Sequence, residues 1–200
     1  MLLSSLLLCC FFGLLAQPAD QTQSGETQIN TGNGRWFFSF YPNQIIKTRW
    51  VPTNQTKNEQ VSDAVILKAS NPAMAPQRNG NGILISKEGN SIRIEGTQIK
   101  YQLANGQQVT LLQAMAETNQ YGYDFSLQPT ERLFGTGERS IPLNRRGYRV
   151  PLNNNPWYGY GLNADALNYS VPFVLSDQSY GIFFDNPSLG SLDMGKTVPD

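Results

Sequence analysis

The chain has 200 residues with 15 basic and 15 acidic side chains, so it has no net charge, and it has no histidine. This length fits one domain, or one domain behind a targeting segment. The charge balance argues against nucleic acid or an anionic membrane surface as the main partner. The lack of histidine excludes Ser-His-Asp and Cys-His catalysis, histidine metal sites and a histidine pH switch.

The first residues have the composition of a secretory signal. Leu2 to Ala16 is an apolar run, which is shorter than the ~20 residues that a transmembrane helix needs. Residues 1–19 are therefore expected to be a signal peptide that is removed on export, with no stable membrane insertion afterwards. The protein is then expected to be periplasmic or secreted. The alternative is that this run is a buried strand or helix of the fold.

Both cysteines of the chain, Cys9 and Cys10, lie inside this apolar run. A lipid anchor on one of them is the less favoured expectation, because Leu8 stands before Cys9 where a small residue is expected. After cleavage the mature chain would have no cysteine, and therefore no disulfide, even in an oxidising compartment.

The residues after the signal change from polar to strand-forming. Residues 20–34 are rich in Gln, Thr, Asn, Ser and Gly and are expected to be a disordered lead-in. From Arg35 onward, aromatic and β-branched residues surround a Pro-Asn turn at Pro42, which predicts two strands. Residues 64–69 are another short strand candidate.

Turn signals then separate a series of short strands. The glycine turns at Gly89 and Gly96 divide three predicted strands, which cover 82–87, 91–95 and 98–103. Residues 111–116 have the most helical propensity in the chain, and apolar alternation resumes over 121–127. About ten short strands without βαβ alternation predict an all-β fold, with one antiparallel β-sandwich domain over residues 35–200.

The acidic residues of the last third each have a structural explanation. Asp177 belongs to a Ser-Asp-Gln-Ser hairpin turn, and Glu138 is expected to form a buried ion pair with Arg132 or Arg139. We therefore expect no catalytic carboxylate in the chain. The Gly-x-Gly that begins at Gly135 lacks the third glycine and the helix of a nucleotide-binding fingerprint, so no cofactor is expected, and no metal.

The segment from Asn144 to Gly161 has the residue types of a sugar-binding surface. It combines two arginines, three consecutive asparagines and three aromatic residues: Arg145, Arg146, Asn153, Asn154, Asn155, Trp157, Tyr158 and Tyr160. Aromatic rings pack against the C–H faces of sugars, and amides or guanidinium groups bind the hydroxyls. The alternative is a well-packed long hairpin whose asparagines make turns and whose aromatic residues fill the core.

Several short motifs occur in a fixed order over the last third: FGTGER, LNRRGY, YGYG, PF-x-LS and YGIFFDN. Together they resemble the end of the N-terminal β-sandwich of glycoside hydrolase family 31, the α-glucosidase family. The resemblance implies a galactose-mutarotase-like supersandwich followed by a (β/α)8 barrel in the same polypeptide. It implies that the barrel supplies an aspartate nucleophile and an aspartate acid/base for retaining catalysis, so that this chain would be inactive alone.

The same resemblance implies a place for the substrate. A hairpin loop similar to Leu143–Tyr160 leans over the barrel mouth, which makes Asn154, Asn155 and Trp157 the candidate substrate-binding residues and gives Arg145 and Arg146 the role of holding the loop. YGYG followed by NYSVPF is more similar to members that act on α-linked oligosaccharides, including transglucosylases. The expected substrate is therefore an α-linked gluco-oligosaccharide.

Two other kinds of protein fit the residues as well. A stand-alone carbohydrate-binding β-sandwich would use the aromatic residues from Trp157 to Tyr160 as a platform and would have no barrel. A structural β-sandwich domain of an envelope protein would bind no sugar. A fold alone does not decide between these functions, so the enzymatic interpretation depends on the ordered motifs.

Overall fold

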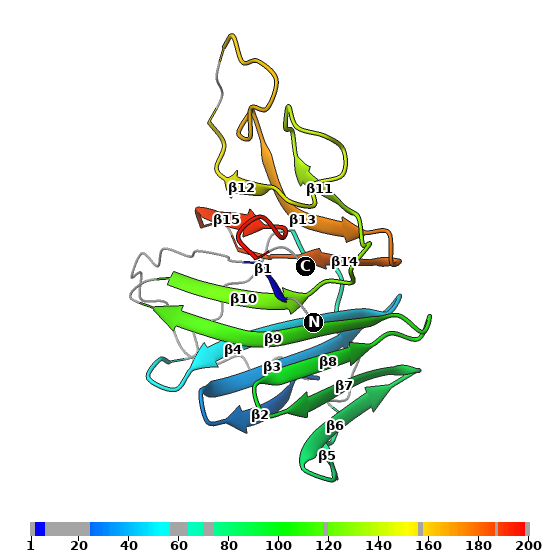
Figure 1. Ribbon diagram of the computed structural model, residues 1–200. Helices are drawn as coiled ribbons and strands as arrows, with labels where there is room; N and C mark the ends of the chain where they lie inside the picture. Colours follow the sequence, from blue (N-terminus) through cyan, green and yellow to red (C-terminus); the bar gives the residue numbers. More distant parts are fainter. Residues whose placement is uncertain are drawn as a thin grey trace. The chain divides into compact units, whose positions relative to one another are not determined.

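The computed structural model describes residues 3–6, 25–56, 64–69, 74–117, 120–155, 158–186 and 188–198. Every regular element in these ranges is a β-strand (Figure 1), and each recorded strand pair is antiparallel. Within the same ranges no helix is both long and apolar enough to cross a membrane. The predicted all-β, antiparallel class is therefore confirmed.

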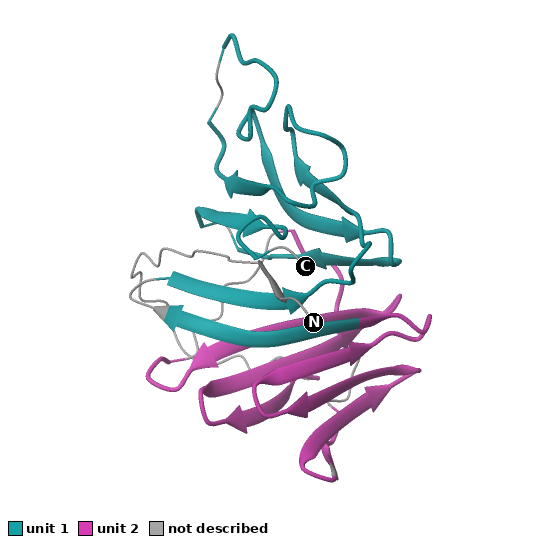
Figure 2. Ribbon diagram, viewed as in Figure 1, with its two compact units in different colours: residues 1–13, 109–200 teal, residues 14–108 magenta. Residues whose placement is uncertain are grey.

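The chain forms two compact units (Figure 2). The first unit consists of Met1–Gly13 and Val109–Asp200, and the second of Leu14–Gln108. Each is described by itself, beginning with the second unit.

One sheet of the second unit is built around a strand that is buried on both faces. The sheet has the order β2 (Thr27–Thr31), β3 (Gly34–Tyr41), β4 (Ile45–Pro52). Trp36, Phe37 and Phe38 are consecutive in β3 and all at most 4% exposed. The Trp36 ring lies 6.0 Å from that of Trp50 on β4. These aromatic contacts explain why the sequence on either side of Pro42 forms the two predicted strands.

The other strands of the second unit form a meander. It runs through β5 (Gln77–Asn79), β6 (Gly82–Lys87), β7 (Asn90–Glu95) and β8 (Gln98–Gln102). Isoleucines fill its inner face, since Ile85, Ile92 and Ile99 are fully buried. Its outer face carries an ion-paired set that we call the polar ladder, in which Glu95 pairs with Arg93 at 3.3 Å and with Lys100 at 2.8 Å. The three strands predicted over 82–103 are thus confirmed, and in them the period-2 alternation separates core from solvent.

Two sequence predictions about the elements are wrong, and a third segment forms a strand where its propensity is helical. Residues 27–31 of the expected disordered lead-in form β2, because Thr27 and Ile29 are buried and the strand pairs with β3. Residues 64–69 form no strand, and Ile66 is 90% exposed there. Residues 111–116 extend strand β9 (Gln108–Glu117), because pairing with β10 (Gln120–Ser126) overrides the helical propensity.

Most of the expected signal peptide lies outside the described residues. Leu3–Leu6 form strand β1, which pairs with β10 in antiparallel register. A strand is one of the two alternatives that the apolar run left open, and removal of residues 1–19 stays a prediction.

The first unit has three groups of strands. Beside β1, β10 and β9 it contains a sheet of order β11 (Leu133–Gly137), β13 (Ser170–Ser176), β14 (Tyr180–Phe183). It also contains the pair β12 (Arg149–Leu152) and β15 (Gly190–Asp193). Their inward side chains form one core, which consists of Leu133, Val150, Leu152, Val174, Phe184, Leu192 and Met194.

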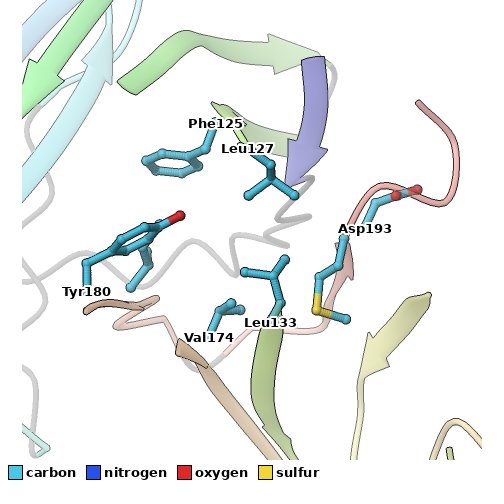
Figure 3. Close-up of a pocket in the computed structure, with 8 residues that line it drawn as sticks. Phe125, Leu127, Leu133, Val174, Tyr180 and Asp193 are labelled. Atoms are coloured by element: carbon cyan, nitrogen blue, oxygen red, sulfur yellow. The ribbon is translucent and has the colours of Figure 1, made fainter. Parts of the chain in front are cut away.

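This core is closely filled. Figure 3 shows Phe125, Leu127, Leu133, Val174 and Tyr180 around a common centre, where a cavity of about 20 Å³ remains. That volume holds about one water molecule. The phenyl ring of Phe125 meets Phe184 edge-on at 6.4 Å. The hollow is therefore a packing gap and not a ligand pocket.

Candidate functional site

A long exposed loop between β12 and β13 is the main candidate site. We call residues 153–169 the aromatic loop. Its outer side chains are large and solvent-exposed: Tyr158 at 97%, Leu162 at 91%, Tyr169 at 55% and Tyr160 at 48%. Large apolar groups gathered in one exposed segment mark a binding surface more often than a passive one.

The two ends of the aromatic loop are held by hydrogen bonds. The backbone N–H of Ser170 donates to Asn154 Oδ1 at 2.6 Å, and Ser170 Oγ donates to the carbonyl of Asn153 at 3.0 Å. On the other side, the N–H of Asn168 donates to the Glu138 carboxylate at 3.1 Å. The N–H of Ser140 donates to the carbonyl of Ala164 at 2.9 Å. These contacts fix the loop close to the segment that follows β11.

Two buried arginines support this segment. Arg139 is 8% exposed, and its Nη2 donates to the Pro151 carbonyl at 2.7 Å and to Ser170 Oγ at 2.9 Å. Arg145 is 7% exposed, and its Nη1 donates to the carbonyls of Ile141 and Pro142 at 2.6 and 2.7 Å. Burial lowers the pKa of both guanidinium groups, and for Arg139 the positive charge of Arg145 lowers the pKa further.

Arg146 and Asn144 continue the support. Arg146 Nη1 donates to the carbonyls of Gln128 and Glu131 at 2.9 and 2.8 Å. Asn144 Oδ1 accepts from the N–H groups of Leu133 and Arg146, both at 3.1 Å. The side chains of Arg145 and Arg146 thus donate to backbone carbonyls between Gln128 and Pro142, which braces the start of the Leu143–Tyr160 segment. Their expected role of holding the loop beside a substrate stays a prediction.

Below this support lies a fully buried carboxylate. Glu131 is 1% exposed and accepts hydrogen bonds from Ser176 Oγ, from Tyr180 Oη at 2.5 Å and from the Gln128 N–H at 2.8 Å. We call these four residues the Glu131 cluster. Burial, followed by the hydrogen bond to Glu131, raises the pKa of the Tyr180 phenol. The cluster ties the turn before β11 to the β13–β14 hairpin.

The predicted substrate-binding residues have different surroundings. Asn154 and Asn155 are both exposed. Asn154 uses its carbonyl oxygen to hold Ser170, and the Asn155 N–H donates to the carbonyl of Leu167 at 3.3 Å. Trp157 lies outside the described residues. Binding of a sugar by these three residues stays a prediction.

The sequence did not single out Tyr169 or Leu162, which are both exposed residues of the aromatic loop. Tyr169 directly precedes β13, and the alternation of the strand does not by itself fix whether its ring points inward or outward. The structure shows that this ring is 55% exposed.

Three carboxylates of the first unit, Glu138, Asp177 and Asp193, have structural partners. The expected pair of Glu138 with Arg132 or Arg139 is wrong, because Glu138 accepts from Asn168 while Arg132 pairs with Asp177 at 2.9 Å. Asp177 lies in the β13–β14 turn, as predicted, and the Arg132 hydrogen bond lowers its pKa. Asp193, 3% exposed, accepts from the N–H groups of Lys196 and Thr197.

An open polar cup lies beside β12 and β15. Its volume is about 550 Å³, and its lining consists of Arg149, Pro151, Asp165, Ser191, Lys196 and Thr197. Two cations and a carboxylate face the same hollow, so the cup offers hydrogen bonds to a polar ligand but no aromatic face. No group of three or more metal-ligating side chains occurs in the described part of the chain.

The protein resembles known sequences over most of its length. The family of glycosyl hydrolase 31 N-terminal galactose mutarotase-like domains matches residues 35–193. The chain belongs to this family. The galactose-mutarotase-like sandwich predicted for this glycoside hydrolase 31 (GH31) N-terminal domain is therefore confirmed.

Curated and solved relatives agree with the family. The GH31 domain is 33% identical over 72 residues to an α-xylosidase of Emericella nidulans, which covers 36% of this chain and 9% of the relative. It is similar in fold to a GH31 dextranase of Flavobacterium johnsoniae, with a TM-score of 0.75, 22% identity and coverage of 90% of this chain and 24% of the other. A cycloalternan-forming enzyme of Listeria monocytogenes has a TM-score of 0.69 at 17% identity, with coverage of 99% and 19%.

The match thus covers a small part of each relative. This GH31 domain spans about a quarter of the dextranase and less of the other two proteins. The likeness to the solved structures shows the fold, and the activity of a whole protein is a separate question.

Proposed function

We propose that this chain is the N-terminal domain of an exported, retaining glycosidase that acts on α-linked gluco-oligosaccharides, as an α-glucosidase or an α-transglucosylase. The observation that carries the proposal is the family match over residues 35–193. A (β/α)8 barrel in the same polypeptide would supply the aspartate nucleophile and the acid/base, which lie ~5–5.5 Å apart in retaining enzymes. The present domain would be inactive alone.

In this proposal the aromatic loop forms part of the wall of the substrate pocket. Tyr158 and Tyr160 offer exposed rings to sugar C–H faces. Asn154, Asn155 and Trp157 supply the remaining contacts. The buried Arg139 holds the base of the loop before substrate arrives, because it donates to the Pro151 carbonyl and to Ser170 Oγ on either side of it. A wall that is ordered in advance positions the substrate at a smaller entropic cost.

Relatives of this domain act on different sugars. The names of the matched proteins include a dextranase, an α-xylosidase and a cycloalternan-forming enzyme. All three names support a glycosidase or a related glycosyl-transferring enzyme. The choice of α-linked gluco-oligosaccharides depends on the YGYG and NYSVPF motifs of the aromatic loop and β13.

A stand-alone carbohydrate-binding domain is the second candidate. The exposure of Tyr158, Tyr160 and Tyr169 favours it, because a platform of exposed rings binds sugars without a barrel. It predicts that the 200-residue chain binds oligosaccharides by itself.

The test compares the enzyme made from the complete gene with the 200-residue chain. The complete protein is expected to release glucose from maltose or isomaltose oligosaccharides and to act poorly on α-xylosides, and the chain alone is expected to show no turnover. Preference for α-xylosides would contradict the proposed substrate. Sugar binding by the chain alone, measured by calorimetry with isomaltotriose, together with a gene that encodes no barrel, would favour the second candidate.

Export is tested separately. When the protein is expressed with residues 1–19, we expect it to be exported from the cytoplasm and these residues to be removed. N-terminal sequencing of the exported form would show the cleavage. A form that begins at Met1 would contradict the signal peptide.

A further inference from the structure

The sheet β11–β13–β14 has two apolar faces. One face contributes Leu133, Val174 and Ile182 to the core of the first unit. Successive residues of a strand point to opposite faces, so the residues between them point away from this core. Phe134 pairs with Leu175, and Phe173 pairs with Phe183, in the recorded register.

We call this second surface the outer face. Its members are large and uncharged: Phe134, Val171, Phe173, Leu175 and Phe183. Leu175 and Phe183 are each 45% exposed, and Val171 is 39% exposed. A methyl group added at Gly181 would lie 2.7 Å from the ring of Phe173, so that ring covers Gly181 of β14. The outer face is therefore an apolar surface.

The polar ladder of the second unit shows the composition of a solvent-exposed sheet face in this chain. There Arg93, Glu95 and Lys100 occupy the outward positions of β7 and β8 and pair with one another. The outer face has no charged side chain among its five members. A sheet that is apolar on both sides is typical of a sheet covered on both sides.

We propose that the outer face is the surface against which the catalytic barrel of the same polypeptide docks; this depends on the proposed function. An uncharged aromatic centre with charged groups at its border is the usual composition of an interface. Here the Arg132–Asp177 ion pair lies at the border, beside the start of β11 and the end of β13. The expected partner surface is apolar, with polar groups opposite this pair.

The length of the relatives favours a partner in the same polypeptide. The matched region makes up 24% of the Flavobacterium dextranase, so there the domain is joined to a remainder about three times its size. Interfaces between domains of one chain bury about 600–1,500 Å². Five large apolar side chains on one sheet face form a centre of suitable size for such an interface.

Cysteine labelling tests the outer face. In a background with Cys9→Ser and Cys10→Ser, single substitutions L175C and F183C report the outer face, and K100C on the polar ladder is the matched control. All three are compared by their rate of reaction with a maleimide, in the 200-residue chain and in the protein from the complete gene. In the complete protein the two outer-face cysteines are expected to react ~10-fold or more slowly, because reaction requires the interface to open. The control is expected to react equally in both.

Each outcome decides one question. If the gene encodes a barrel and both outer-face cysteines react at the same rate in the two proteins, the docking surface is wrong while the proposed function stands. If the 200-residue chain dimerises in analytical ultracentrifugation and already protects both positions, the occupant is a second copy, which also overturns the proposal. If the complete gene encodes no barrel, the proposed function itself is contradicted.

Discussion

Removal of the buried carboxylate at Glu131 tests the account of how the first unit is held together. In Glu131→Ala, Ser176 Oγ and Tyr180 Oη lose their acceptor, and both residues are less than 9% exposed. Each buried polar group left without a partner costs about 1–3 kcal/mol. Relief of the desolvation of the carboxylate offsets part of this loss. We therefore expect the free energy of unfolding to fall by about 3 kcal/mol, a large part of a typical domain stability of about 5–15 kcal/mol.

Glu131→Gln separates the hydrogen bonds from the charge. The amide keeps the volume, its oxygen can accept from Gln128 N–H, and its NH₂ can donate to Ser176 or Tyr180. The expected loss is about 1 kcal/mol, within the net worth of one hydrogen bond. Glu95→Ala is the control, because Glu95 lies on the exposed polar ladder, and its removal is expected to change stability little.

The assay is equilibrium urea unfolding of the 200-residue chain, followed by circular dichroism. Equal slopes with shifted midpoints would mean that stability alone has changed. An unchanged midpoint for Glu131→Ala would refute the reasoning, since it would mean that the three donors find other partners. A loss for Glu131→Gln as large as that for Glu131→Ala would show that the charge matters more than the acceptor count.

Three other predictions concern the same unit. Because the pKa of Tyr180 is raised in the folded protein, its phenol ionises more readily in the unfolded chain. The stabilisation is therefore fully present below the ordinary pKa of 10.0 and falls as the pH rises above that value. Tyr180→Phe should remove this alkaline loss of stability, as measured by urea unfolding at pH 9 to 11. Gly137→Ala should lower the stability far more than Gly106→Ala, although both glycines have φ near +90°. The added methyl group would lie 2.7 Å from the Tyr169 carbonyl oxygen at position 137, whereas it meets no atom at position 106. Equal urea midpoints for the two variants would contradict this close approach. Arg145→Lys should increase amide hydrogen exchange over residues 139–148. The reason is that an ammonium group lacks the forked donors with which Arg145 reaches the Ile141, Pro142 and Gly135 carbonyls together. Unchanged exchange would contradict the supporting role of Arg145.

Local signals in the sequence were sufficient for the strands that are neighbours along the chain. The glycines at Gly89 and Gly96, both with positive φ, mark the turns of the β6–β7–β8 meander. Strand β2 was missed because its polar composition hides the two buried side chains, Thr27 and Ile29, that alternate in it. A polar segment can form a strand when a neighbouring strand supplies the ladder.

The candidate site could be predicted only in part. A structural role for Arg145 and Arg146 was implied by the resemblance, and the carbonyls that these arginines contact lie within 18 residues of them along the chain. The Glu131 cluster joins residues 45 and 49 positions apart, and no periodicity connects such distant groups. For the same reason the partner of Glu138 was assigned to nearby arginines, while the observed donor is Asn168, which lies 30 positions away.

The most direct test of the proposed function is the coding sequence for several hundred codons beyond Asp200. The proposal predicts an open frame that continues into alternating strands and helices, with aspartates at the ends of strands where a (β/α)8 barrel places its catalytic residues. A genuine stop codon just past Asp200, with no frameshift, would contradict the enzyme and leave the carbohydrate-binding domain as the better interpretation.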